Sequence, residues 1–195
     1  KNSKIIVMSL IILMIVILTS QQITQNKMEN VKTNKTENIK INQKDINTAI
    51  LAGGCFWCIE AGLEQIEGII SVDSGYTGGH TINPTYNEVT SGRSGHYEAV
   101  EVKFDKTKIT YKTVLEEFFK LFDPTDDSGS FADKGSQYKS AIFYKNDKEK
   151  QIAQILIENL TESKIYDKPI VCLLYTSPSP RDAHESRMPS SAWKK

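Results

Sequence analysis

The spacing of apolar and polar residues divides the middle of the chain into strands and helices. Residues 98–104 alternate between polar and apolar and predict a strand. Residues 111–122 carry apolar side chains at helical spacing and predict an amphipathic helix. The other elements predicted in this way are a strand at 48–52, a helix at 56–66, strands at 69–74 and 138–144, a helix at 148–160 and a strand that begins within 168–171.

The order of these elements predicts the fold class. Strands and helices follow one another as β-α-β-β-α-β, which is the order of a ferredoxin-like split β-α-β unit. We therefore predict one α+β domain over residues 48–171, with two layers and a third helix at 148–160.

The N-terminal residues predict export. Lys1 and Lys4 precede an apolar run at 5–18 that only Ser9 interrupts. Such a run is shorter than the roughly 20 residues that span a bilayer, and it matches the apolar region of a secretory signal. We expect residues 1–20 to be a signal peptide or a retained signal anchor, and any contact with a membrane to be confined to them. The protein is then periplasmic, extracellular or membrane-anchored.

Two further segments differ from the domain in composition. Residues 21–47 are rich in Asn, Lys, Gln and Thr and contain no aromatic residue, Gly or Pro, which predicts a disordered linker. Residues 172–195 hold three of the six Pro and two of the three Arg of the chain. We expect this last segment to be foreign to the domain, and the alternative is a natural tail rich in Pro and Ser.

The net charge of zero conceals three parts of different charge. Residues 1–47 carry +4, residues 48–171 carry −6 and residues 172–195 carry +2. Because a nucleic-acid binder shows a basic excess, this balance argues against that class. Three Cys are too few for a disulfide scaffold, and neither His80 nor His96 has the spacing of a zinc ligand. We therefore expect no metal site.

Cys55 is the first candidate for chemistry. It follows Gly53-Gly54 at the end of a predicted strand and opens a predicted helix, with Cys58 three residues later on the same helical face. Unpaired backbone N–H groups and the helix dipole favour an anion there, so we expect Cys55 to be a thiolate. The two thiols can cycle between dithiol and disulfide. A purely structural disulfide and a thioredoxin-like disulfide oxidoreductase remain as alternatives.

Glu98 is the second candidate. Strand alternation places it on the same face as Val100, Val102 and Phe104, which is the inward face. Because burial disfavours a charged carboxylate, we expect the pKa of Glu98 to rise, so that it remains a proton donor near neutrality. The alternative is a carboxylate paired with a cation or with backbone amides at the sheet edge.

Several motifs, in order, resemble those of the peptide methionine sulfoxide reductase A family, whose members reduce methionine S-sulfoxide, free or in proteins. The motifs are Gly-Gly-Cys-Phe-Trp-Cys at 53–58, Ser-Gly-Tyr-Thr-Gly-Gly at 74–79, Asn-Pro-Thr-Tyr-Asn-Glu-Val at 83–89, Ser-Gly-x-x-Gly-His-Tyr-Glu-Ala-Val at 91–100, Phe-Asp-Pro-Thr at 122–125 and Ala-Asp-Lys-Gly-Ser-Gln-Tyr-Lys-Ser at 132–140. The resemblance covers roughly residues 48–171.

The resemblance implies roles for particular residues. Cys55 matches the nucleophile that attacks the sulfoxide sulfur, Glu98 matches the acid that protonates its oxygen, and Cys58 is the thiol available to form a disulfide with Cys55. The tyrosines match the ligands of the oxygen, the Phe-Trp pair matches the pocket for the methyl group, and the aspartate matches a residue that positions substrate and water. These substrate-binding residues are Phe56, Trp57, Tyr86, Asp133 and Tyr138.

The resemblance also implies the reductant, the cofactor requirement and the substrate of the protein. A thioredoxin-like dithiol is the reductant and no cofactor is bound, and we expect a monomer that acts on methionine sulfoxide in oxidised proteins. Family members often carry recycling Cys near the C-terminus, whereas only Cys58 is available here. The later family segment that follows the last predicted strand is missing, so we expect a C-terminally truncated member.

Overall fold

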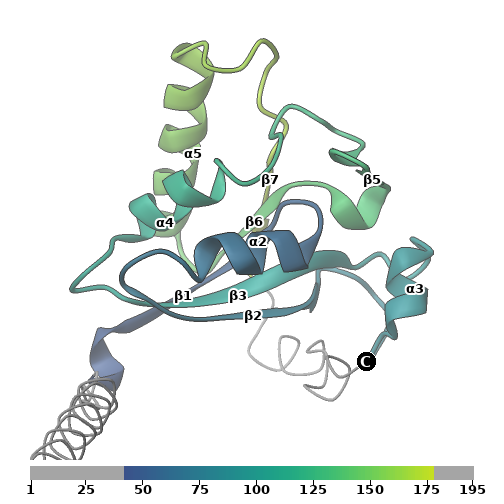
Figure 1. Cartoon of the computed structure of the whole chain (residues 1–195), viewed down its shortest axis with the longest axis horizontal. Coiled ribbons are helices and arrows are strands. Elements are labelled where there is room, and N and C mark those ends of the chain that lie inside the picture. Colours follow the sequence, from purple (N-terminus) through teal and green to yellow (C-terminus); the bar gives the residue numbers. More distant parts are fainter. Residues whose placement is uncertain (1–41, 178–195) are drawn as a thin grey trace, which may run out of the picture. The chain divides into compact units, whose positions relative to one another are not determined.

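A five-stranded sheet organises residues 42–177, the part of the chain that this computed structural model describes (Figure 1). The strands are β1 (Ile46–Ala52), β2 (Ile69–Thr77), β3 (Tyr97–Asp105), β6 (Ala141–Tyr144) and β7 (Leu173–Thr176). They lie in the order β2-β3-β1-β6-β7. All neighbouring pairs are antiparallel except β6 and β7, which are parallel.

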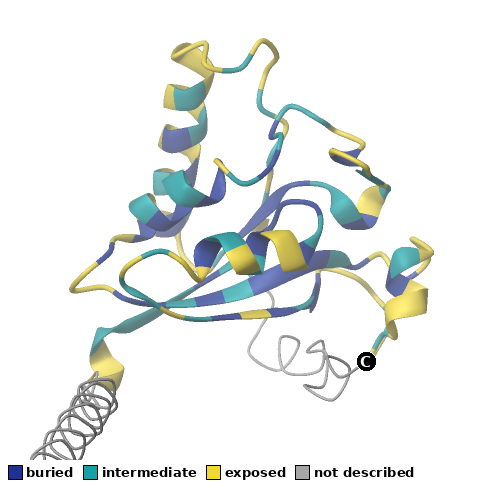
Figure 2. Ribbon diagram, in the orientation of Figure 1, coloured by how far each residue is buried: buried dark blue, intermediate teal, exposed yellow. Residues whose placement is uncertain are grey.

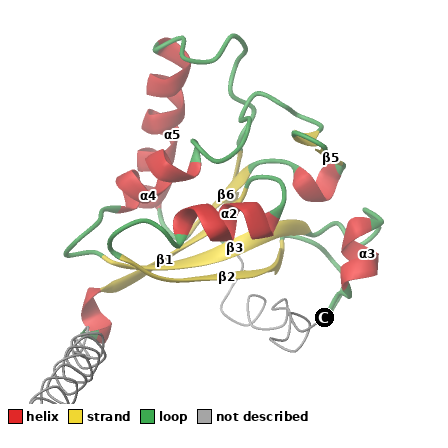
Figure 3. Ribbon diagram, viewed as in Figure 1, coloured by secondary structure: helices red, strands yellow, loops and turns green. Residues whose placement is uncertain are grey.

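The longer helices cover one face of this sheet, as Figure 3 shows. They are α2 (Phe56–Leu63), α4 (Tyr111–Phe118) and α5 (Asp147–Glu162). The shorter elements are η1 (Gln43–Asp45), α3 (Tyr86–Thr90), η2 (Ser136–Tyr138) and a small hairpin of β4 (Gly129–Ser130) and β5 (Asp133–Lys134). These shorter elements carry several of the predicted site residues.

The predicted fold class is confirmed. Strands β1, β2, β3 and β6 and helices α2 and α4 follow the β-α-β-β-α-β order, and α5 is the predicted third helix. Some bounds differ from those predicted. The strand expected at 138–144 begins only at Ala141, because Ser136–Tyr138 form a 3₁₀ helix, and the helix expected at 111–122 ends at Phe118.

The core lies between the sheet and the helices, where Figure 2 shows the buried residues. Val100, Val102 and Phe104 point into it from alternate positions of β3, and all three are buried. Phe118 and Leu115 of α4 meet them from the opposite layer. Each such side chain stabilises the fold by roughly 1.5–3 kcal/mol through burial, so the sheet that carries Glu98 is firmly held.

Both ends of the described domain extend beyond the predicted bounds. Gln43–Asp45 form η1 and Ile46 already pairs with Asp105, so residues 43–47 of the predicted linker are structured. At the other end, β7 lies beyond the predicted boundary at residue 171, and Tyr175 stacks on Phe143 of β6 with ring centroids 5.5 Å apart. The first residues of the segment expected to be foreign therefore add a strand to the sheet.

The remaining predictions about the ends of the chain fall outside the described residues. These are the signal segment at 1–20, the linker up to residue 41 and the segment from residue 178 onward. Within residues 42–177, no helix has both the length and the apolar character needed to span a bilayer.

Candidate active site

A tight glycine turn places Cys55 at the start of α2. After β1 ends at Ala52, Gly54 adopts a φ of +97°, which side chains other than hydrogen rarely tolerate. A Cβ on Gly54 would also lie only 2.6 Å from the Cβ of Ser130. Cys55 then occupies the N-cap of α2, and its carbonyl oxygen accepts hydrogen bonds from the backbone N–H groups of Cys58 and Ile59. The position predicted for Cys55 is confirmed.

Cys55 and Cys58 are free thiols whose side chains form a hydrogen bond with each other. Burial of the Cys55 thiol raises its pKa above the ordinary value, and this effect outweighs the backbone N–H groups of Cys58 and Trp57, which lower it. The prediction that Cys55 is a thiolate is therefore wrong, because burial raises the pKa of its thiol more than the N–H groups at the helix start lower it.

Glu98 lies beneath the first turn of α2. Its side chain is only 2 % exposed, and its Oε2 accepts a 3.3 Å hydrogen bond from the backbone N–H of Phe56. Burial raises the pKa of Glu98 to about 7, and the negative charge of Asp133 adds to the rise, while the Phe56 amide opposes it. The predicted rise is confirmed, so close to half of the Glu98 carboxyl groups carry a proton near neutrality.

Aromatic rings cover the side of α2 next to Cys55. Phe56 is buried, and its ring centroid lies 5.2 Å from that of Trp57. Trp57 in turn stacks on Tyr86, with centroids 6.1 Å apart and an angle of 18° between the ring planes. Trp57 is 43 % exposed and Tyr86 is 42 % exposed. The structure thus forms an open aromatic surface that a small apolar group can contact.

The remaining predicted residues come from three short elements around Glu98. Tyr86 is the first residue of α3, Asp133 lies in β5 and Tyr138 ends η2. Burial, followed by the charge of Glu98, raises the pKa of both tyrosines, that of Tyr138 to about 12. Both phenols therefore stay protonated and can donate hydrogen bonds to an oxygen atom placed between them and Glu98. The structure brings the predicted site residues together.

Sequence reasoning missed two features of this site. Helix α3 was not among the predicted elements, yet Thr85 and Glu88 form a reciprocal capping box at its start. The Thr-x-x-Glu spacing is a signal that could have revealed this helix. Tyr76 was quoted only as part of a motif, but it is buried, stacks on Phe56 and lies opposite Glu98 in the sheet. Its proximity to Glu98 depends on strand register, which one strand alone does not specify.

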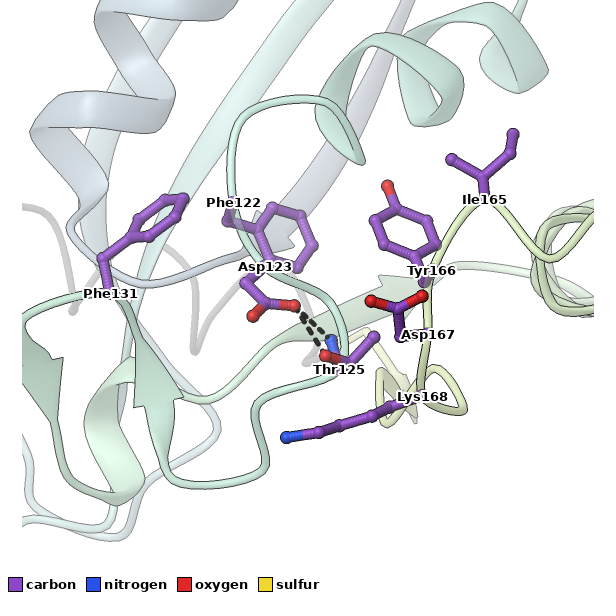
Figure 4. A pocket seen from close by; sticks show the side chains of 8 residues that line it. All are labelled: Phe122, Asp123, Thr125, Phe131, Ile165, Tyr166, Asp167 and Lys168. Atoms are coloured by element: carbon purple, nitrogen blue, oxygen red, sulfur yellow. Dashed lines mark hydrogen bonds between the residues drawn. The ribbon is translucent and has the colours of Figure 1, made fainter.

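A separate pocket of about 430 Å³ lies between the end of α4, the β4–β5 hairpin and the loop after α5 (Figure 4). Its lining residues are Phe122, Asp123, Thr125, Phe131, Ile165, Tyr166, Asp167 and Lys168. None of the predicted site residues lines it. Within residues 42–177, no group of three or more His, Cys, Asp or Glu side chains is arranged to hold a metal ion. The candidate active site is therefore the group around Cys55 and Glu98.

Comparison with known proteins identifies relatives of this chain. Residues 47–181 match the family model described as Peptide methionine sulfoxide reductase. Peptide methionine sulfoxide reductase MsrA of Bacillus subtilis (strain 168) is 51 % identical over 123 residues, which are 63 % of this chain and 70 % of that protein. Peptide methionine sulfoxide reductase MsrA/MsrB of Vibrio cholerae is 48 % identical over 122 residues, 63 % of this chain but only 32 % of that longer protein.

Solved structures share the fold. Methionine sulfoxide reductase A of Corynebacterium diphtheriae has a TM-score of 0.62 at 28 % identity, over 75 % of this chain and 71 % of that one. Mxr1 from Saccharomyces cerevisiae, solved in complex with Trx2, has a TM-score of 0.50 at 18 % identity, over 78 % of this chain and 95 % of that one, and is similar in fold alone. Since the family match spans nearly the whole described domain and includes Cys55 and Glu98, this chain belongs to the peptide methionine sulfoxide reductase family.

Proposed function

We propose that this chain reduces methionine S-sulfoxide, free or in proteins, to methionine, with Cys55 as the nucleophile. The observation that carries the proposal is the contact between Glu98 and the first turn of α2. The Phe56 amide, one residue after Cys55, binds the carboxyl group of Glu98. A thiol and a carboxylic acid that retains a proton near neutrality therefore lie next to each other.

The two groups suit the two halves of a sulfoxide reduction. Glu98 donates its proton to the sulfinyl oxygen, which makes the sulfur more electrophilic, and Cys55 attacks that sulfur. The hydroxyl group passes from the substrate sulfur to the Sγ of Cys55 as the S–O bond and the transient S–Sγ bond break. Methionine leaves with its sulfur reduced by two electrons, and Cys55 becomes a sulfenic acid that carries the oxygen. The proton lost by the Cys55 thiol restores the Glu98 carboxyl group. A thiol that is protonated at rest is compatible with this step, because the substrate is activated first.

The surrounding side chains suit the substrate. The exposed rings of Trp57 and Tyr86 offer an apolar surface for the methyl group, where sulfur–aromatic contacts are favourable. The protonated phenols of Tyr86 and Tyr138 donate hydrogen bonds to the sulfinyl oxygen. Asp133, close enough to raise the pKa of Glu98, positions the substrate and a water molecule.

Cys58 completes the cycle. Its exposed thiol is already hydrogen-bonded to Cys55, so it can attack the sulfenic acid, form a disulfide and release water. A thioredoxin-like dithiol then reduces the disulfide, and no prosthetic group is required. The solved complex of a protein of the same fold with Trx2 supports such a donor. A thioredoxin-like oxidoreductase, the alternative reading of Cys55 and Cys58, leaves Glu98 and its phenols without a role.

The setting of the enzyme is also proposed. We propose that the enzyme acts as a monomer. The basic start and the apolar run at 5–18 support export, with the enzyme periplasmic, extracellular or membrane-anchored. The reducing equivalents would then come from a thioredoxin-like donor outside the cytoplasm.

The test compares the full chain with Cys55→Ser and Cys58→Ser in the reduction of a peptide methionine S-sulfoxide. With dithiothreitol, the unchanged chain turns over and Cys55→Ser does not. Cys58→Ser reduces about one equivalent in a single turnover and fails to turn over with thioredoxin, since it forms no intramolecular disulfide. Sulfoxide reduction that survives Cys55→Ser would contradict the proposal, as would an unchanged chain that reduces disulfides but no sulfoxide.

A further inference from the structure

Tyr76 and Glu98 face each other across two strands. They are directly paired in the antiparallel register of β2 and β3, so both side chains point to the helix-covered face. Side chains paired in this way have Cβ atoms about 4.5–5.5 Å apart. Tyr76 is only 4 % exposed, so its ring is buried beside Glu98 on the same face of the sheet.

The ring of Tyr76 also packs on the residue that binds Glu98. Its centroid lies 5.7 Å from that of Phe56, with the ring planes 30° apart. The backbone N–H of Phe56, at the start of α2, donates a hydrogen bond to the carboxylate of Glu98. Tyr76, Phe56 and Glu98 therefore form a closed group of side chains from β2, α2 and β3.

The phenol of Tyr76 lies among the groups that surround the reacting oxygen. Burial raises its pKa most strongly, and the charges of Glu98, Tyr86 and Tyr138 raise it further. The titratable groups that interact with the charge of Glu98 are Tyr76 on β2, Tyr86 on α3, Asp133 on β5 and Tyr138 at the end of η2. Among them, Asp133 is the group whose charge raises the pKa of Glu98.

We propose that Tyr76 is a positioning residue that covers Glu98 from the side of β2 and keeps water away from its carboxyl group. The inference rests on the proposed function, in which Glu98 must hold a proton at neutral pH. Tyr76 acts through the volume of its ring, because burial is the main cause of the raised pKa of Glu98 and Tyr76 is the residue paired with it. Removing the ring therefore admits water and lets the carboxyl group ionise.

The experiment measures the pH dependence of kcat in the full chain for Tyr76→Leu and Tyr76→Phe. Tyr76→Leu removes this cover, and a fall of one unit in the pKa of Glu98 lowers kcat about fivefold at pH 7 but less than about twofold at pH 5. Tyr76→Phe keeps the ring and keeps the pH profile. Tyr97→Leu is the matched control, since Tyr97 lies one pair further along the same two strands, on the opposite face, and its substitution leaves the profile unchanged.

A second measurement is independent of activity. The carboxyl carbon signal of Glu98 in an NMR spectrum, identified by its absence in Glu98→Gln, is titrated in each variant. We expect its midpoint near 7 in the unchanged chain and about one unit lower in Tyr76→Leu. This titration separates a failure of the Tyr76 proposal from a failure of the proposed function. A chain without sulfoxide reductase activity still shows whether Tyr76→Leu shifts the pKa of Glu98.

The proposal is overturned if Tyr76→Leu lowers kcat by the same factor at pH 5 and pH 7, which indicates a general loss of structure, or if it leaves the Glu98 midpoint unchanged. Thermal unfolding of each variant shows whether it folds. Should Tyr76→Leu not fold, Tyr76→Met, which retains more buried volume, is carried through the same titration under the same criteria.

Discussion

The backbone N–H of Phe56 donates a 3.3 Å hydrogen bond to Oε2 of Glu98, which joins the first turn of α2 to β3 across 42 positions of sequence. Because Cys55 immediately precedes Phe56, this bond fixes the position of the proposed nucleophile relative to the proposed acid. The same hydrogen bond lowers the pKa of Glu98, but burial raises it more, so that the pKa is about 7. The site thus combines a rigid placement with a proton that can be donated.

Glu98→Gln should lower the turnover of methionine S-sulfoxide at pH 6 on the order of 100-fold or more, because the neutral amide has no acidic proton to transfer to the substrate. Folding is expected to survive, since Gln can still accept the bond from Phe56. The control is Glu101→Gln in the same strand, which faces away from the core and should keep the rate. Steady-state kinetics at several pH values checks this. A Glu98→Gln enzyme with the full rate contradicts the acid role.

Glu98 should also make the stability of the protein depend on pH. Its pKa rises from 4.5 in the unfolded chain to about 7 in the folded one, so the folded state binds more protons between these values. The stabilisation by the bound proton is complete below pH 4.5 and is lost as the pH rises through 7. The free energy of unfolding therefore falls by on the order of 3 kcal/mol on account of Glu98.

The check is urea unfolding of the unchanged chain and of Glu98→Gln at pH 4.5 and pH 8. The variant lacks the ionisation, so its stability relative to the unchanged chain should improve at pH 8. An equal difference between the two proteins at both pH values would place the Glu98 pKa near its ordinary value, contrary to the structure.

The sequence allowed the burial of Glu98 to be predicted, because alternation in one strand depends only on local geometry. The state of the Cys55 thiol was not predictable in this way. Its pKa depends on how far burial outweighs the N–H groups of the helix start, and burial depends on packing that the sequence does not specify. The proximity of Tyr76 to Glu98 could not be predicted either, because it depends on the register between β2 and β3. The pairing of β7 with β6 was missed because the composition of residues 172–195 differs from that of the domain. The concentration of Pro and Arg in residues 172–195 suggested a foreign segment, whereas its first residues form a strand.

Gly54→Ala should reduce both stability and turnover. The substitution strains a φ of +97° and pushes a Cβ to 2.6 Å from that of Ser130, so the turn before Cys55 must move. A displacement of about 1 Å at the nucleophile is expected to lower kcat/KM on the order of 100-fold. Gly68→Ala is the matched control, with a φ of +94° and a contact of 2.9 Å to Ile109, away from the site. It should lose comparable stability, measured by thermal unfolding, and keep its turnover.

Thr85→Ala should weaken substrate binding through α3. Thr85 caps this helix, whose first residue is Tyr86, and its hydroxyl accepts from the Glu88 amide. Loss of such a cap costs about 1 kcal/mol of helix stability, so Tyr86 becomes less well placed and KM rises. Thr110→Ala removes an equivalent cap from α4, where Thr110 accepts from Thr113, and should lower the unfolding midpoint without changing KM. Equal effects of both variants on KM would contradict the assignment of Tyr86.

The last prediction concerns β7, whose neighbouring residues Leu173 and Leu174 point to opposite faces of the sheet. Leu174 packs against the core between sheet and helices, while Leu173 is 39 % exposed. Leu174→Asp therefore places a carboxylate against apolar side chains and should lower the free energy of unfolding by roughly 1–3 kcal/mol. Leu173→Asp should change it by less than about 0.5 kcal/mol. Chemical unfolding of both variants decides whether this strand belongs to the domain, since a segment foreign to the fold would tolerate the two substitutions equally.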